Sequence, residues 1–237
     1  SVGTVGGTML AGIGLTGDLS IAFAAMIGAG AVMGLVLAVA RRVSSSMTLL
    51  VLGVMVGFLT NSFVGLLLFF AIPDQIQAYI NWTFGSFNGV TWNQLRIMAP
   101  AVIVGLLLAT LLTKSLNALL LGEGYARTLG VNVLRVRVGV VLATAVLAGV
   151  VTAFAGPIGF IGIAVPHLCR SALGTSDHRV LVPGTMIVGA LAALLAAIIA
   201  EVPGSNLVLP LNAITALIGA PMVIAVILRR REVAFST

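Results

Sequence analysis

Long apolar runs, separated by short polar stretches, make up most of this chain. A membrane-spanning helix needs about 20 mostly apolar residues, and these runs lack the two-residue alternation of a β-strand. The pattern therefore predicts an all-α, polytopic transmembrane bundle of about eight helices. The predicted segments are Val2–Leu15, Leu19–Ala40, Met47–Phe70, Trp92–Thr113, Leu134–Phe154, Ile158–Leu173, Val180–Ala200 and Leu211–Leu228.

The composition supports a membrane protein. Hydrophobic residues make up 60% and charged residues 8% of the 237 residues, and the mean hydropathy is +1.22. Soluble domains are roughly 45–50% apolar and about 25% charged, so lipid must form part of the solvent. The 28 glycines fit the close packing of membrane helices. A single cysteine, Cys169, excludes an intrachain disulfide and a cysteine-based metal cluster.

The net charge of +6 is explained by membrane topology rather than by nucleic acid. If the ARRVSSS turn is cytoplasmic and the segments alternate, every Lys and Arg except Arg96 falls inside, as the positive-inside rule requires. This threading predicts a cytoplasmic C-terminus. It also makes residues 121–133 and 174–180 cytoplasmic loops, whereas residues 71–91 face outward.

The sequence contains no recognisable catalytic, nucleotide-binding or metal-binding motif. His167 and His178 have no cysteine or carboxylate at ligand spacing, so we predict no metal site and no cofactor in this chain. The acidic residues all fall at predicted helix ends, which argues against the buried ion relay of a secondary transporter. An ion site built from backbone carbonyls keeps that alternative open. A transporter that has neither a nucleotide-binding site nor buried ion-coupling residues of its own must take its energy from a partner protein.

One polar, glycine-punctuated stretch, LGEGYARTLGVNV, interrupts the apolar runs at residues 121–133. It contains glycines for sharp turns, an acid–base pair one helical turn apart, and three residues that we expect to form an apolar face. From the residues alone, an ordinary polar loop explains the stretch equally well. The residues are, in that order, Gly122, Gly124 and Gly130; Glu123 and Arg127; and Tyr125, Ala126 and Leu129.

Glycine and proline crowd a second stretch, AGPIGFIGIAVPHLCRSALGTSDHRVLVPG, at residues 155–184. At membrane depth such residues break a helix or let another backbone approach closely, and a plain packing site explains them as well. In a third stretch, PLNAITALIGAPMVIAVILRRRE, we expect Pro221 to kink the last helix near its middle. The candidate helix-break and packing residues are Gly156, Pro157, Gly159, Phe160, Gly162, Pro166, Gly219 and Pro221.

Together the three stretches resemble the FecCD family, the permease subunits of ATP-driven importers for iron-siderophores, haem and cobalamin. The family's pattern reads LGE-x-x-A-x-x-LG, then AGPIGFIGL-x-x-PH-x-x-R, DHR-x-x-LP and P-x-x-x-x-TA-x-x-GAP. The motifs occur here in this order, and the resemblance covers essentially the whole chain. Matching positions include Leu121, Gly122, Glu123, Ala126, Leu129, Gly130, residues 156–162, Pro166, the cytoplasmic set His167, Arg170, Asp177, His178 and Arg179, and residues 215–221.

The resemblance implies a function and an assembly. Residues 121–133 would be the coupling helix that sits in a cleft of the ATPase subunit. A second permease copy, two cytoplasmic ATPases that carry ATP and Mg, and a periplasmic binding protein would complete a bacterial inner-membrane importer. The cargo would be a ferric siderophore, haem or cobalamin, carried by alternating access. The form VPGSNLVLPLNAITALIGAP favours an iron chelate.

Departures from the family pattern limit what the resemblance implies. Its members are similar in having about ten helices, so the first two and the start of the third are expected to be missing from this single permease domain, residues 1–237. Gly124 stands where an acidic side chain is common. By analogy Thr60, Asn61 and Ser62 would line the pathway, although interhelical hydrogen bonding explains them equally well. Arg96 would contact the binding protein or simply snorkel to the interface.

Overall fold

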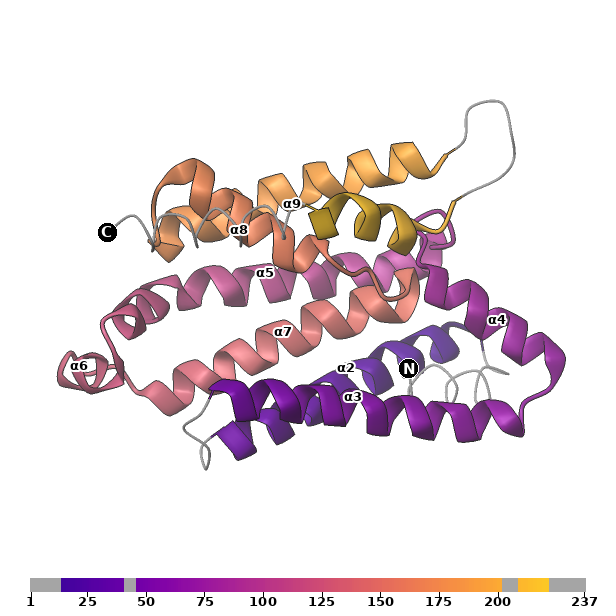
Figure 1. Cartoon of the computed structure of the whole chain (residues 1–237), viewed down its shortest axis with the longest axis horizontal. Coiled ribbons are helices and arrows are strands. Elements are labelled where there is room, and N and C mark those ends of the chain that lie inside the picture. Colours follow the sequence, from indigo (N-terminus) through magenta and orange to yellow (C-terminus); the bar gives the residue numbers. More distant parts are fainter. Residues whose placement is uncertain (1–13, 41–45, 202–208, 222–237) are drawn as a thin grey trace. The chain divides into compact units, whose positions relative to one another are not determined.

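The computed structural model describes residues 14–40, 46–201 and 209–221, and helices dominate these ranges (Figure 1). Nearly all of the first predicted segment, Val2–Leu15, lies outside the described residues. The chain divides into two compact units, one within residues 1–83, 89–109 and 134–156, the other within residues 84–88, 110–133 and 157–237. The all-α prediction is confirmed.

The described helices follow the predicted segments closely, with two additions. Apolar length sets the long helices, because a backbone in lipid must satisfy its hydrogen bonds internally. Five of the described helices are long and apolar enough to cross a membrane: α2, α3, α5, α7 and α9. The bounds are α2 Gly14–Ala40, α3 Ser46–Phe69, α4 Pro73–Phe84, α5 Trp92–Leu120, α6 Glu123–Thr128, α7 Val133–Ala155, α8 Ile161–Leu173 and α9 His178–Ala200, and a further apolar helix, Leu211–Pro221.

Helix α4 is a correction to the sequence analysis, which left residues 71–91 as an outward loop. Its 12 residues are too few to span a bilayer. Pro73 suits the first helical position, since it has no N–H to leave unbonded, and Asp74 lies favourably at the positive end of the helix dipole. The polar residues between the apolar ones hid this helix from a search for spanning segments.

Small residues bring helices of the first unit together. A Cβ on Gly149 of α7 would lie 2.8 Å from the Cα of Met26 in α2. A Cβ on Gly105 of α5 would lie 2.6 Å from Cγ of Leu147 in α7. Both positions therefore accept only glycine without a shift of the neighbour, as close packing between membrane helices requires.

The second unit packs α8 against α9 around two buried clusters. Val165 and Cys169 of α8 meet Leu181 of α9 in one. The other joins the end of α9 to the helix Leu211–Pro221 and contains Ala196, Ala200, Leu211 and Ile214. Helix α8 has only 13 residues, so it cannot cross the bilayer alone. It starts at Ile161, three residues later than predicted, and it continues through Pro166.

Candidate functional site

The polar stretch at residues 121–133 forms the short helix α6, held between two glycine turns. Gly122 has φ 99° and Gly130 has φ 80°, a region that glycine enters without steric cost. The amide of Ala126 donates to the carbonyl of Gly122 at 3.0 Å, and the amide of Val131 donates to the carbonyl of Ala126 at 3.0 Å. The backbone therefore fixes α6 directly after the end of α5.

The exposed side of α6 carries apolar side chains. Tyr125 is 53% exposed and Leu129 is 57% exposed, and both lie on one side because they are one turn apart. Ala126 was expected to share this face, but it is fully buried, at 0% exposure. Adjacent helical residues point about 100° apart, so Ala126 faces inward while Tyr125 and Leu129 stay exposed. Glu123 and Arg127 are exposed.

Asn117, in the last turn of α5, links this region to the start of α9. Its Oδ1 accepts the backbone N–H of His178 at 2.8 Å and lies 2.8 Å from Nδ1 of the same residue. Its Nδ2 donates to Oδ1 of Asp177. A single amide therefore contacts two residues of the DHR motif, and the sequence analysis did not single it out.

Asp177 caps the N-terminus of α9. Its Oδ1 accepts the backbone N–H of Arg179 at 2.8 Å, and its own N–H donates to Oγ1 of Thr175 at 3.1 Å. The bond from the Arg179 amide, followed by the bond from Asn117, lowers the pKa of Asp177 below its usual value. Hydrogen bonds to an ionised carboxylate stabilise the charged form, so this cap is strongest when Asp177 is ionised.

His167 and Arg170 lie on α8, and both are half-buried. The Nε of Arg170 is buried without a hydrogen-bond partner. Of the residues predicted to form a cytoplasmic motif, Asp177 and His178 are therefore joined through Asn117, whereas Arg179 contributes its backbone amide and has an exposed side chain. No cluster of three or more His, Cys, Asp or Glu residues able to hold a metal occurs in the described ranges.

The predicted helix break lies between α7 and α8, at residues 156–160. Gly156 has φ 79°, and Phe160 has φ 63° and ψ −41°. The amide of Ile161 donates to the carbonyl of Gly159 at 2.7 Å. Phe160 is therefore the central residue of a strained γ-turn, in a backbone region that side chains other than glycine rarely adopt. Pro157, half-buried, lies within the same non-helical stretch.

The helix Leu211–Pro221 holds this break in place. The amide of Gly159 donates to Oδ1 of Asn212 at 3.2 Å. A Cβ on Gly219 would lie 2.7 Å from the Cβ of Phe160, so the two backbones approach closely. Gly162, by contrast, is exposed with open space around it. Pro221 is the last described residue of its helix, so the predicted mid-helix kink lies outside the described residues.

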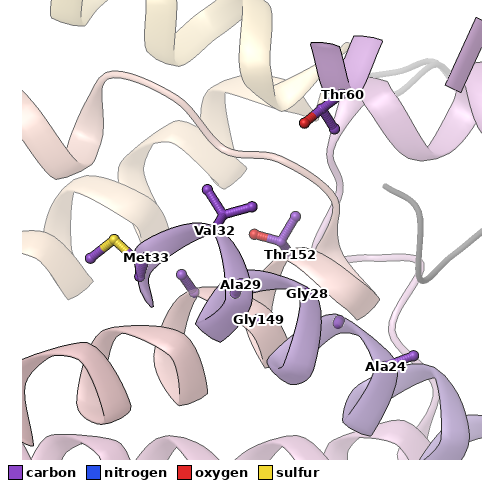
Figure 2. Close-up of a pocket in the computed structure, with 10 residues that line it drawn as sticks. Ala24, Gly28, Ala29, Val32, Met33, Thr60, Gly149 and Thr152 are labelled. Atoms are coloured by element: carbon purple, nitrogen blue, oxygen red, sulfur yellow. The ribbon is translucent and has the colours of Figure 1, made fainter. Parts of the chain in front are cut away.

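A cavity of about 570 Å³ lies within the first unit. Figure 2 shows Ala24, Gly28 and Val32 of α2 beside Thr152 of α7 and Thr60 of α3. The lining is otherwise made of small or apolar residues, so the two threonines give the wall its polar groups. Of the three predicted pathway residues, Thr60 lines this cavity.

The hydroxyl of Thr60 donates to the carbonyl of Val56, one turn back in α3, at 2.9 Å. This bond is within one helix and is not the interhelical bond considered as the alternative. Asn61 and Ser62 are exposed on α3 and do not line the cavity. Arg96 is exposed near the start of α5.

Five apolar spans, a strained break between α7 and α8, and an exposed short helix with apolar side chains define a polytopic membrane transport protein. The chain belongs to the FecCD transport family, whose pattern it matches over residues 1–229. The family comprises permease subunits of ATP-binding-cassette importers, which are not themselves enzymes.

Curated relatives and a solved structure agree with this assignment. The vitamin B12 import system permease protein BtuC of Citrobacter koseri is 36% identical over 231 residues, which are 98% of this chain and 69% of the relative. The BtuC protein of Klebsiella pneumoniae is 38% identical over 230 residues, with 97% and 69% covered. A metal-chelate type ABC transporter, solved in an inward-facing conformation, matches with TM-score 0.80 and 29% identity over 96% of this chain and 72% of its own. The chain is thus a multi-pass inner-membrane permease of an ABC importer.

Proposed function

We propose that this permease carries a metal chelate across the bacterial inner membrane by alternating access, with ATP hydrolysed on a separate ATPase. The observation that carries the proposal is the placement of α6. Two glycine turns and the buried Ala126 hold this helix rigidly, while Tyr125 and Leu129 stay exposed. A rigid helix with an exposed apolar face suits a cleft on a soluble partner. ATP binding would close the ATPases and move α6 with them.

The complete importer would contain two permease copies, two ATPases and a periplasmic binding protein. Helix α3 supports the pairing of two copies, because most of its side chains whose surroundings are described are exposed, with Val64 as a buried exception. Gly53 and Gly57, spaced as in a helix-packing motif, have nothing within 4 Å of an added Cβ. Their open surface leaves room for another helix to approach closely.

The transport path would be apolar with scattered neutral polar groups. Thr60 supports this proposal because it lines the cavity in the first unit. Asn61 and Ser62 point to other sides of the same helix, where they are exposed, and they would line the path only beyond that cavity. The distribution of basic residues supports a cytoplasmic location for α6 and the C-terminus in this proposal. Arg96 would then lie on the outer side, where an acidic patch of the binding protein could meet it.

A ferric siderophore is the cargo that the sequence favours, on the form of residues 202–221. A corrinoid is the second candidate, because the curated relatives named above import vitamin B12. Both are large metal chelates with few net charges relative to their size. A neutral, mostly apolar path suits either class better than it suits a small hydrated ion.

The test is uptake by cells that carry the full-length permease with its ATPase and binding protein. Labelled ferric siderophore, haem and cyanocobalamin would be offered separately, with the ATPase intact or disabled by a Walker-lysine substitution. We expect uptake of one chelate class with the intact ATPase and background uptake with the disabled one. Uptake that ignores the ATPase and follows an ion gradient would instead establish the alternative, an ion-coupled secondary transporter.

A further inference from the structure

We propose that Asn117 is a positioning residue that ties the coupling helix α6 to the N-terminus of α9, so that the two move together. The inference rests on the proposed function, because it concerns how motion of α6 reaches the membrane helices. All the contacts involved lie within the second unit. They join residues 60 and 61 positions apart in the chain.

The chemistry of the two partners fixes the orientation of the Asn117 amide. The backbone N–H of His178 is a donor, so it must face Oδ1. The ionised carboxylate of Asp177 is an acceptor, so it must face Nδ2. Because the same Oδ1 also lies 2.8 Å from Nδ1 of His178, that ring nitrogen must carry a proton. The bridge therefore needs a side chain at position 117 that carries both an acceptor for His178 and a donor for Asp177, as an amide does.

On one side of this bridge the backbone leads directly into α6. The amide of Leu121 donates to the carbonyl of Ala118 at 3.3 Å, and that of Gly122 donates to Leu119 at 3.1 Å. The bond from Ala126 to the carbonyl of Gly122 then continues the chain of contacts into α6. These hydrogen bonds leave no unbonded linker between Asn117 and the coupling helix, so a displacement of α6 is transmitted to the side chain of Asn117.

On the other side the bridge ends on a helix that spans the membrane. Asp177 caps α9 through the amide of Arg179, and the amide of Leu181 donates to the carbonyl of Asp177 at 2.8 Å. Leu181 is buried against α8. At the far end of α9, Oε1 of Glu201 accepts a hydrogen bond from Nδ2 of Asn88 at 3.0 Å. Motion received at Asp177 can therefore reach α9 and, through the buried Leu181, α8.

A donor–acceptor inversion tests the bridge. Asn117→Asp places a carboxylate against Asp177, which repels it. In the unchanged chain one oxygen, Oδ1 of Asp177, accepts both the Asn117 bond and the Arg179 bond. Adding Asp177→Asn removes the like charge, and after a rotation of the new amide its Nδ2 can donate to the new carboxylate while its Oδ1 accepts the Arg179 amide. Ser176→Asp is the matched control, since it adds the same charge next to Asp177, at an exposed residue that takes no part in the Asn117 bonds.

The readout is the distance between spin labels at Thr128→Cys and Val180→Cys, both exposed. Full-length permease with its ATPase in lipid nanodiscs would be measured without nucleotide and after trapping with ATP and vanadate. Cys169 is buried and stays unlabelled. With the bridge unmodified, and also in S176D, we expect a narrow distribution of label-to-label distances that is nearly the same with and without trapped nucleotide. In N117D the distribution should broaden on trapping, and in the double variant it should narrow again.

The transport readout is chelate uptake per ATP hydrolysed, measured with labelled cyanocobalamin and with a labelled ferric hydroxamate. It should fall roughly five- to tenfold in N117D and recover in the double variant, whereas a purely structural loss lowers uptake and hydrolysis in parallel. N117D behaviour identical to S176D, or a double variant no better than N117D, overturns the inference and leaves the proposed function standing. Failure of the unmodified permease to bind its ATPase overturns both.

Discussion

The indole Nε1 of Trp82 in α4 lies 3.0 Å from the carbonyl oxygen of Thr152, in the last turn of α7. It also lies 3.2 Å from the carbonyl oxygen of Ala153. The carbonyl of Thr152 also accepts the backbone N–H of Gly156 at 3.1 Å, so the indole N–H of Trp82 is a second donor there. Trp82 thus adds a side-chain donor to two carbonyls in the last turn of α7, where intrahelical partners run out. Because Thr152 also lines the cavity of the first unit, Trp82 connects a short non-spanning helix to the cavity wall.

Trp82→Phe should lower the stability of the permease by about 1 kcal/mol, the usual net value of one hydrogen bond. Phenylalanine keeps most of the ring but cannot donate to the two carbonyls. Thermal unfolding of the permease in detergent measures the change. Trp92→Phe is the control, since Trp92 is 81% exposed at the start of α5, and equal shifts in the two variants would contradict the role of Trp82.

Gly219→Ala should destabilise the break between α7 and α8 by roughly 1–3 kcal/mol. The new methyl group would lie 2.7 Å from the Cβ of Phe160, an atom that cannot rotate away. Gly162→Ala is the matched control: it lies inside α8 with nothing within 4 Å, and it should stabilise by about 0.5–1 kcal/mol. The unfolding midpoints of the two variants should therefore move in opposite directions, and a shared direction would show that the close approach is unimportant.

Leu129→Asp and Tyr125→Asp should abolish binding of the ATPase while the permease stays folded. Both side chains are more than half exposed, so each substitution should change the free energy of unfolding by less than about 0.5 kcal/mol. Co-purification of the ATPase with tagged permease measures binding. If the ATPase still co-purified with both variants, α6 would not be the element that docks on it.

Ala126→Asp, on the same short helix, should instead unfold the region. Ala126 is fully buried, and an unpaired carboxylate there should cost about 3 kcal/mol or more. The measurement is the yield of monodisperse protein in size-exclusion chromatography. A well-folded Ala126→Asp permease would mean that α6 is not anchored through this residue.

Acid should weaken the α9 cap through Asp177. The pKa of Asp177 is lower in the folded than in the unfolded chain, mainly because the Arg179 amide donates to it. Its contribution is therefore complete above the unfolded pKa of about 4 and is lost as the pH falls through the folded pKa. Asp177→Asn cannot titrate, so its unfolding midpoint should fall less steeply on acidification below about pH 4 than that of the unchanged chain. Parallel profiles would contradict the assignment.

Sequence reasoning identified the spanning helices because their signal is local. Lipid requires about 20 consecutive apolar residues whose backbone bonds stay within the segment, and α2, α3, α5, α7 and α9 meet that condition. Glycine turns around residues at helical spacing indicated a short helix at α6, although an ordinary polar loop explained that stretch equally well. Helix α4 was missed because 12 residues of mixed polarity give no spanning signal, although Pro73 and Asp74 mark its start.

The individual contacts of the candidate site could not be read from the sequence. Asn117 meets Asp177 across 60 positions, and Trp82 meets Thr152 across 70. A lone polar residue at a helix end has many possible partners, and nothing nearby in the chain selects one. The same holds for Ala126, which looked like part of the exposed face of α6 but is buried.

The sequence by itself determined that this is a helical membrane protein whose apolar runs are interrupted at residues 121–133 and 156–160, because hydropathy, glycine and proline act on the local backbone. Tertiary structure alone decided which polar groups meet and which face of α6 is exposed. Those outcomes depend on how helices distant in sequence pack together, and packing brings together side chains that local rules cannot pair.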